Sequence, residues 1–132
     1  MIIAKEDAPL HFSKKALTQA ENMPKEVSDS EKEGRFDFRE DCVVTIDGDD
    51  AHDFDDAVSI RRLGSGYQIT VHIADVTEYV KRGSALDEDA ITRGTSIYVA
   101  DRVVPMLPFE LSNGICSLNP NVDRLTLSCI MD

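Results

Sequence analysis

The chain has few cysteines and no long apolar run, and both shortages narrow the classes of protein to which it can belong. Cys42, Cys116 and Cys129 form an odd set without a CxxC spacing. This usage predicts a reducing compartment with buried thiols that pack as small apolar side chains, and it argues against a disulfide framework. No stretch resembles a signal peptide or a membrane span. We therefore expect a cytoplasmic protein that does not associate with a membrane.

Basic residues are also scarce. The 132 residues include 14 lysines and arginines against 25 aspartates and glutamates, so the formal net charge is −11. A chain with this balance is not expected to hold a nucleic-acid backbone by charge alone. If the ligand is a nucleic acid, a metal ion or other parts of a larger protein must supply the attraction.

The residue pattern divides the chain into a helical lead-in over residues 1–40 and a β-rich region over residues 41–132. In the lead-in, Ser13 can cap a helix, and Ser28 with Glu31 forms a capping box before a short second helix. The predicted elements of the β-rich region are strands at 42–46, 57–60, 67–74, 97–99 and 125–131 and a helix between Ser84 and Gly94. We expect an α+β fold in which helices pack on a twisted mixed or antiparallel sheet.

The predicted strand at 67–74 alternates apolar and polar residues and should form a hairpin with the strand before it. Its apolar positions, such as Ile69 and Ile73, are expected to face the core. His72 lies on the other, polar face and is expected to be exposed. Asp75 follows the strand, where a carboxylate can cap the next turn.

An acidic run is the most informative feature of the sequence. Six of the ten residues from Asp47 to Asp56 are aspartates. Because crowded carboxylates repel one another, such a run is either a solvated loop or a site that cations neutralise. Gly48 allows a sharp turn after the first strand, and Phe54 is expected to enter the core and pin the loop. Ligands that offer only oxygen suit hard cations such as Mg²⁺, Mn²⁺ or Ca²⁺.

The spacing of the acidic run excludes an EF-hand. Counting from Asp47, the position that requires glycine holds His52, and the position that requires the terminal glutamate holds Val58. Three interpretations remain, of which one is a plain solvated acidic loop. Carboxylate-bound Mg²⁺ could promote phosphodiester hydrolysis, or the chain could be a non-catalytic acidic domain that binds metal or a partner.

The run and its flanks, Thr45–Val58, closely resemble the active-site motif of the RNB family, which includes the ribonuclease II and ribonuclease R exoribonucleases. The residues are closer to the ribonuclease R pattern. Further stretches match the family in the same order, namely His72–Val76, Arg93–Tyr98, Asp101–Pro108, Leu111–Pro120 and Asp123–Leu125.

The resemblance implies a processive 3′→5′ exoribonuclease that acts on the 3′ end of single-stranded RNA. Such an enzyme uses Mg²⁺, with Mn²⁺ as a substitute, and releases nucleoside 5′-monophosphates. Four acidic positions of the family motif fall on Asp47, Asp53, Asp55 and Asp56, which would hold the metal and orient the water and the scissile phosphate. Tyr98 matches the family tyrosine that stacks near the RNA 3′ end. The alternative is an ordinary strand aromatic.

The family pattern continues beyond Asp132. It includes an arginine and a glutamate that assist catalysis, and flanking cold-shock-like and S1 RNA-binding domains. The resemblance therefore implies that residues 41–132 are the N-terminal portion of the catalytic domain, and we expect the isolated chain to degrade RNA very poorly. A sheet interrupted at the chain end would have an open edge, through which the chain could self-associate.

Other polar residues of the matched stretches are assigned less chemistry. Asp49 and Asp50 lie outside the acidic set of the family and are interpreted as loop charges. Arg102 and Arg124 could contact phosphate, but surface ion pairs are an equal explanation. Asn113 is interpreted as a structural residue of the loop wall.

Overall fold

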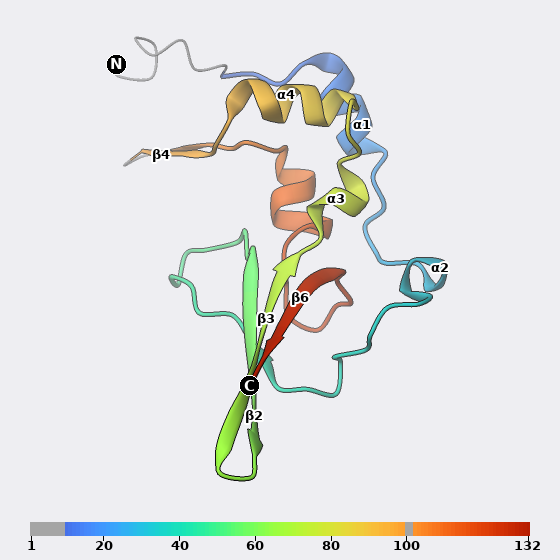
Figure 1. The fold of residues 1–132 in the computed structure, drawn as a ribbon. Coiled ribbons are helices and arrows are strands. Elements are labelled where there is room, and N and C mark those ends of the chain that lie inside the picture. The colour runs from blue at the N-terminus through green and yellow to red at the C-terminus, as the bar shows by residue number, and fades with distance from the viewer. Residues whose placement is uncertain (1–9, 100–101) are drawn as a thin grey trace.

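The computed structural model describes residues 10–99 and 102–132 and has the predicted α+β architecture (Figure 1). Asp101, in one of the matched stretches, lies outside the described residues. The elements in chain order are α1 (Lys14–Glu21), α2 (Asp29–Lys32), β1 (Val43–Val44), β2 (Asp56–Leu63), β3 (Gly66–Ala74), α3 (Val76–Tyr79), α4 (Ala85–Arg93), β4 (Ile97–Val99), β5 (Arg102–Val104), the π-helical turn η2 (Leu111–Ile115) and β6 (Thr126–Met131).

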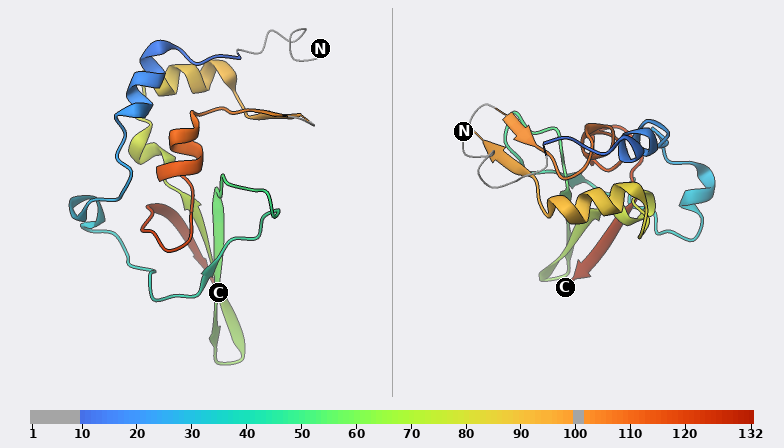
Figure 2. Two further views of the ribbon diagram at one scale, coloured as in Figure 1. Left: turned by 180° about the vertical axis from the view of Figure 1, so that it is seen from behind. Right: turned by 90° about the horizontal axis from the view of Figure 1, so that it is seen from above.

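Helices α1 and α4 pack side by side at one end of the molecule (Figures 1 and 2). Ser13 caps α1 as predicted, since its hydroxyl accepts a hydrogen bond from the Ala16 amide. The two helices are also joined by the Leu86 amide, which donates to the Gln19 side chain at 3.1 Å. Ala16 and Leu86 are almost fully buried in the main apolar core, which also includes side chains from α3 and η2. The lead-in helix therefore packs into the core of the domain.

A four-stranded antiparallel sheet in the order β1-β2-β3-β6 forms the other end of the molecule. The predicted hairpin is confirmed: β2 and β3 pair over their whole length and are joined at Gly64, which has a φ of 54° that glycine adopts without strain. Strands β4 and β5 form a separate two-stranded ribbon. The edges of the larger sheet are β1 and β6, and self-association through such an edge stays a prediction.

The sequence pattern assigned the wrong face of β3 to the interior. His72 is 2% exposed and buried, whereas Ile69 and Ile73 are 43% and 46% exposed. The His72 ring shares hydrogen bonds with the hydroxyls of Ser59 and Ser128 at 3.2 and 2.9 Å, so its polar atoms are satisfied inside the protein. Burial lowers the pKa of His72. An alternating pattern gives the period of a strand, but the surrounding chain decides which face is covered.

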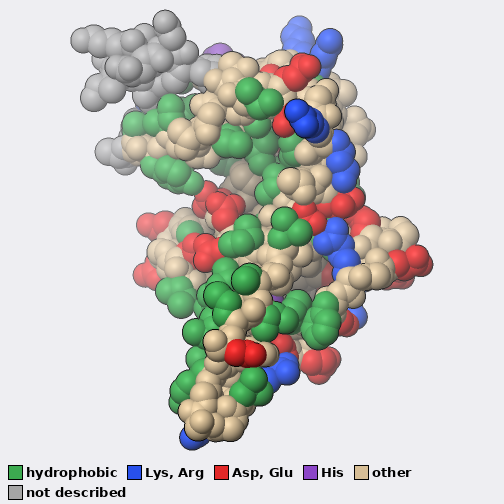
Figure 3. Space-filling model, viewed as in Figure 1, with side chains coloured by type: hydrophobic (Ala, Val, Ile, Leu, Met, Phe, Trp, Pro, Cys, Tyr) green, Lys and Arg blue, Asp and Glu red, His purple; other side chains and the backbone are tan. Residues whose placement is uncertain are grey.

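The opposite face of the sheet is apolar and open to solvent. By register, Ile60 on β2, Ile69 and Ile73 on β3, and Leu127 and Met131 on β6 share this face, and all five are exposed. Hydrophobic side chains accordingly spread over the lower part of the molecule in Figure 3.

The expectation of three buried thiols holds for Cys116 alone. Cys116 is buried, and desolvation raises the pKa of its thiol to about 12. Cys42, just before edge strand β1, and Cys129, on edge strand β6, are both exposed.

No helix within residues 10–99 and 102–132 is both long and apolar enough to cross a bilayer.

Candidate functional site

The aspartate-rich segment forms the connection between β1 and β2. Asp47, Asp53 and Asp55 lie in the loop, and Asp56 is the first residue of β2. In Figure 3, acidic side chains gather on the part of the surface where Figure 1 shows this loop. The loop consists of an anchored half, residues 52–56, and an open half, residues 47–51, which differ in how the rest of the chain holds them.

The anchored half is tied to the segment that follows η2. The Ser117 hydroxyl accepts a hydrogen bond from the Phe54 amide and donates one to the His52 carbonyl, both at 3.0 Å. The Leu118 amide donates to the Phe54 carbonyl at 2.9 Å. The backbone on both sides of Asp53 is therefore held by residues more than sixty positions further along the chain.

Strand β3 holds the end of the anchored half. The Ala74 amide donates to the Asp55 carbonyl at 2.9 Å, and Asp56 pairs with Ile73 in the sheet. Phe54 was expected to pin the loop by entering the core. Its side chain is only half-buried and does not belong to the main apolar core, and it is its backbone that makes the bonds to Ser117 and Leu118.

Tyr98 on β4 contacts the anchored half through its hydroxyl. Its hydroxyl donates a 2.7 Å hydrogen bond to a carboxylate oxygen of Asp53. This bond, together with partial burial and the charges of Asp53 and Asp55, raises the pKa of Tyr98. Tyr98 is 65% exposed and is not a packed core aromatic. The structure thus brings together two candidate residues that are 45 positions apart.

The open half has a single local bond, from the Ala51 amide to the Gly48 carbonyl at 3.0 Å. The side chains of Asp47, Asp49 and Asp50 are exposed and make no hydrogen bond or ion pair with the part of the chain that the structure describes. Their charges are consequently left to solvent or to a ligand.

The candidate carboxylates interact electrostatically. Partial desolvation raises the pKa of Asp55, and the negative charges of Asp53, Asp56 and Asp47 raise it further. The four candidates are therefore close enough for each of the other three to disfavour ionisation of Asp55. A cation at this position would reverse that effect.

The chemistry of these side chains suits a hard divalent cation, because they offer carboxylate oxygens alone. Within the described ranges, however, no group of three or more histidine, cysteine, aspartate or glutamate side chains is arranged to hold a metal ion. Asp47, Asp55 and Asp56 are exposed, and no hydrogen bond or ion pair with the described residues fixes their carboxylates. Asp53 is the exception, because its carboxylate is already bonded to Tyr98.

Two other polar residues have structural contacts. Asp75 is buried at the start of α3, where its carboxylate accepts from the Thr77 hydroxyl at 2.8 Å and pairs with Arg35 at 3.0 Å. Burial raises the pKa of Asp75, but these bonds outweigh it and the pKa is lowered. Arg124 donates to the backbone carbonyls of Ser117 and Asp123 at 2.9 and 2.8 Å. Arg124 thus binds backbone carbonyls in place of the phosphate or acidic partner considered from sequence.

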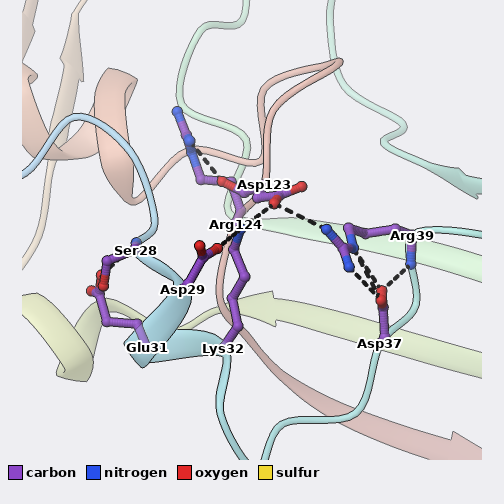
Figure 4. Close-up of polar contacts among 8 residues, drawn as sticks. All are labelled: Ser28, Asp29, Glu31, Lys32, Asp37, Arg39, Asp123 and Arg124. Carbon is purple, nitrogen blue, oxygen red and sulfur yellow. Dashed lines mark hydrogen bonds and ion pairs between the residues drawn. The ribbon is translucent and has the colours of Figure 1, made fainter.

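An ion-pair network fixes the segment around Arg124 (Figure 4). The Asp123 carboxylate forms ion pairs with Lys32 at 2.9 Å and with Arg39 at 3.3 Å, and Arg39 also forms an ion pair with Asp37 at 2.6 Å. Most of these side chains are exposed, so each pair adds little stability by itself. Together they connect residues 32–39 to Asp123, in the chain that leads from Ser117 to β6.

A hollow in the described surface is lined by residues on both flanks of the acidic loop, Thr45 and Ala57. Its volume is about 940 Å³, and its lining includes Phe38, His72 and Arg39 but none of the six aspartates. His72 is satisfied by neighbouring hydroxyls, and Arg39 is paired with aspartates. We therefore keep the acidic loop as the candidate site.

Sequence reasoning did not single out Ser117. It lies in a matched stretch, but a lone serine between Cys116 and Leu118 carries no spacing signal that would distinguish it. The contact with His52 and Phe54 joins positions that only the folded chain brings together.

The RNB domain family model matches residues 35–132. The chain is 55% identical over 132 residues to Ribonuclease R 1 of Lactococcus lactis and 52% identical over 134 residues to Ribonuclease R of Thermotoga maritima, in each case over 99% of the chain. It spans only 16% and 19% of the lengths of these relatives.

Solved structures show the same likeness. Mycoplasma genitalium RNase R in complex with ribose methylated single-stranded RNA matches 98% of this chain with a TM-score of 0.90 and 32% identity, and the match covers 20% of that protein's chain. Yeast Ssd1, described as a pseudonuclease, matches 82% of the chain with a TM-score of 0.67 and 24% identity, a likeness of fold alone.

Proposed function

The chain belongs to the RNB-domain family, and from this premise we propose that it forms part of a metal-dependent 3′→5′ exoribonuclease. The observation that carries the proposal is the acidic loop, where four carboxylates at the motif positions interact electrostatically and Tyr98 reaches Asp53. The proposed substrate is the 3′ end of single-stranded RNA, and the proposed products are nucleoside 5′-monophosphates. The chain spans less than a fifth of the length of the ribonuclease R relatives named above. The presence of flanking cold-shock-like and S1 domains in the whole protein is therefore also part of the proposal.

Asp47, Asp53, Asp55 and Asp56 are the proposed holders of Mg²⁺ or Mn²⁺. When bound, the cation would supply charge for the scissile phosphate and lower the pKa of a water molecule. The chain's own part is to hold the acidic side chains near one another. The raised pKa of Asp55 supports this role, because it reflects uncompensated negative charge where a cation would be favourable.

Tyr98 is the proposed stacking residue for the last bases of the RNA. Its ring is largely exposed, and its hydroxyl is tied to Asp53, so the ring has a defined position beside the carboxylates. Stacking on an aromatic face tolerates every base, which a degradative enzyme requires.

The test is an RNA hydrolysis assay on the natural polypeptide that contains this chain. With 5′-labelled single-stranded RNA and Mg²⁺, we expect progressive shortening from the 3′ end and release of nucleoside 5′-monophosphates. Asp55→Asn should abolish most of this activity while the far-UV circular dichroism spectrum is retained. Full activity of Asp55→Asn would contradict the catalytic assignment. We expect the 132-residue chain alone to degrade RNA very poorly.

The second candidate is a non-catalytic acidic domain that binds metal or a partner. Two observations favour it: no three side chains of the described residues are arranged to hold a metal ion, and the fold also occurs in a protein described as a pseudonuclease. A fold by itself does not determine activity. Mn²⁺ that stabilises the chain against heat, with no RNA hydrolysis by the natural polypeptide, would support this candidate.

A further inference from the structure

Ser117 is one of the contacts by which distant parts of the chain reach the acidic loop. Its side chain is 0% exposed. Its amide donates to the Gly114 carbonyl of η2 at 3.1 Å, and its carbonyl accepts from the Arg124 guanidinium at 2.9 Å. The backbone of Ser117 is therefore held by hydrogen bonds that do not involve its hydroxyl.

The hydroxyl makes two close bonds of opposite kind and has a third, longer contact with the Asn119 side-chain oxygen at 3.5 Å. It accepts from the Phe54 amide and donates to the His52 carbonyl, so it needs both a lone pair and a proton. An apolar side chain at this position would leave an amide and a carbonyl without these partners. A buried amide or carbonyl that loses its hydrogen-bond partner lowers the free energy of unfolding.

Both bonded backbone groups flank Asp53. The His52 carbonyl precedes Asp53 and the Phe54 amide follows it, so one hydroxyl restrains the backbone on both sides of this residue. The Asp53 carboxylate is held separately by Tyr98. Asp53 is thus fixed through its backbone and through its side chain, whereas Asp49 and Asp50 have no side-chain partner among the described residues and only the local Gly48–Ala51 turn bond on their backbone.

We propose that Ser117 is a positioning residue, whose hydroxyl holds the backbone around Asp53 so that the Asp53 carboxylate is presented at the site. The identity of the ligand in this inference rests on the proposed function. The restraint on the backbone around Asp53 rests on the hydrogen bonds alone. Ser117 acts through Asp53 and does not itself touch metal or RNA.

The first test needs no metal. Ser117→Thr and Ser117→Val introduce side chains of the same branched shape, in which valine has a methyl group where threonine has the hydroxyl. Strain from the methyl group that both variants add is therefore common to them. We expect amide hydrogen exchange at Phe54 to be at least about tenfold faster in the valine variant than in the threonine variant. The Ala74 amide, which is bound to Asp55, should exchange equally in both. Equal exchange at Phe54 in the two variants would overturn the proposal. If the valine variant does not fold, Ser117→Ala compared with wild type replaces it.

The second test measures Mn²⁺ affinity by electron paramagnetic resonance on the whole chain. Outer-shell partners of metal ligands typically change metal affinity by about 10- to 100-fold, and we expect the dissociation constant of the valine variant to rise by this factor relative to the threonine variant. Ser59→Ala is the control, because it removes a buried hydroxyl that binds His72 and leaves the acidic loop intact. Its affinity should stay within about twofold of wild type.

The two experiments separate this inference from the proposed function. If wild type does not bind Mn²⁺, the metal assignment fails, and amide exchange at Phe54 still decides whether Ser117 restrains Asp53. If wild type binds Mn²⁺ and the threonine and valine variants bind it equally, the positioning role fails while the metal assignment stands.

Discussion

Both halves of the acidic loop carry aspartates, but contacts with other parts of the chain restrain one half and not the other. Residues 52–56 are held by Ser117, Leu118, Tyr98 and β3, whereas residues 47–51 have one local turn bond. Carboxylates in a row repel one another, so fixing them has an energetic cost that the surrounding contacts must offset. The chain restrains the half that holds three of the four motif aspartates and leaves the other half free. Restraint by the rest of the chain therefore separates Asp53, Asp55 and Asp56 from the loop charges Asp49 and Asp50, but it does not separate the fourth candidate, Asp47, from them.

The largest expected difference between the halves lies in catalysis. In the natural polypeptide, Asp53→Asn should reduce the rate of RNA hydrolysis at least about a hundredfold, because it removes a fixed charge from the proposed metal site. Asp49→Asn and Asp50→Asn should each change the rate less than about twofold, since neither side chain has a fixed position. Steady-state kinetics on single-stranded RNA measures both. A similar loss in all three variants would remove the distinction between the halves.

A second prediction concerns the segment that anchors residues 52–56. Arg124→Met keeps most of the side-chain volume but removes the bonds to the Ser117 and Asp123 carbonyls. The free energy of unfolding should fall by about 1 to 3 kcal/mol, because half-buried carbonyls lose a charged donor. Urea denaturation measures the loss, and amide exchange at Phe54 should accelerate.

Arg39→Met is the matched control for this prediction. Arg39 pairs with Asp37 and Asp123 at the exposed surface, where ion pairs contribute little. Its removal should be less destabilising than Arg124→Met and should leave exchange at Phe54 unchanged. If the two arginine variants behave alike, the anchoring segment depends on the whole ion-pair network and not on Arg124.

The stability of the metal-free chain should depend on Asp55 and on pH. The pKa of Asp55 is raised in the folded chain, so the protonated form is favoured there, and the stability it contributes is lost as the pH rises through that raised pKa. With EDTA present, Asp55→Asn should therefore raise the melting temperature at pH 7 by roughly a few degrees. The difference should shrink as the pH falls towards the ordinary aspartate pKa of about 4. Differential scanning calorimetry at both pH values checks the sign.

The smallest expected effect is that of the Tyr98 hydroxyl. Tyr98→Phe keeps the exposed ring and removes the hydrogen bond to Asp53. Because the bond lies at the surface, Mn²⁺ affinity should change by only about two- to threefold. RNA affinity should be retained in Tyr98→Phe and reduced in Tyr98→Ala, because stacking uses the ring. Fluorescence anisotropy with labelled RNA and the natural polypeptide measures the difference.

Much of the local structure could be predicted from the residues themselves. Ser13 and Ser84 cap helices, and the hairpin of β2 and β3 forms around its glycine turn, because capping bonds and turn conformations depend on neighbours in the chain. The same reasoning failed at His72. Alternation cannot tell which face of a strand the remaining chain will cover, and here the covered face is the polar one.

The sequence by itself determined where the negative charge lies and which family the acidic run resembles, because both depend on residue identity and spacing alone. The tertiary structure decided which aspartates are held. It brought the Ser117 hydroxyl to the His52 carbonyl and the Phe54 amide, which lie 65 and 63 positions away in the chain. It also brought the Tyr98 hydroxyl to the carboxylate of Asp53, which lies 45 positions away. The physical reason is that these restraints are hydrogen bonds between groups far apart in the chain. Such bonds form only where packing of the helices and the sheet has brought donor and acceptor within about 3 Å of each other.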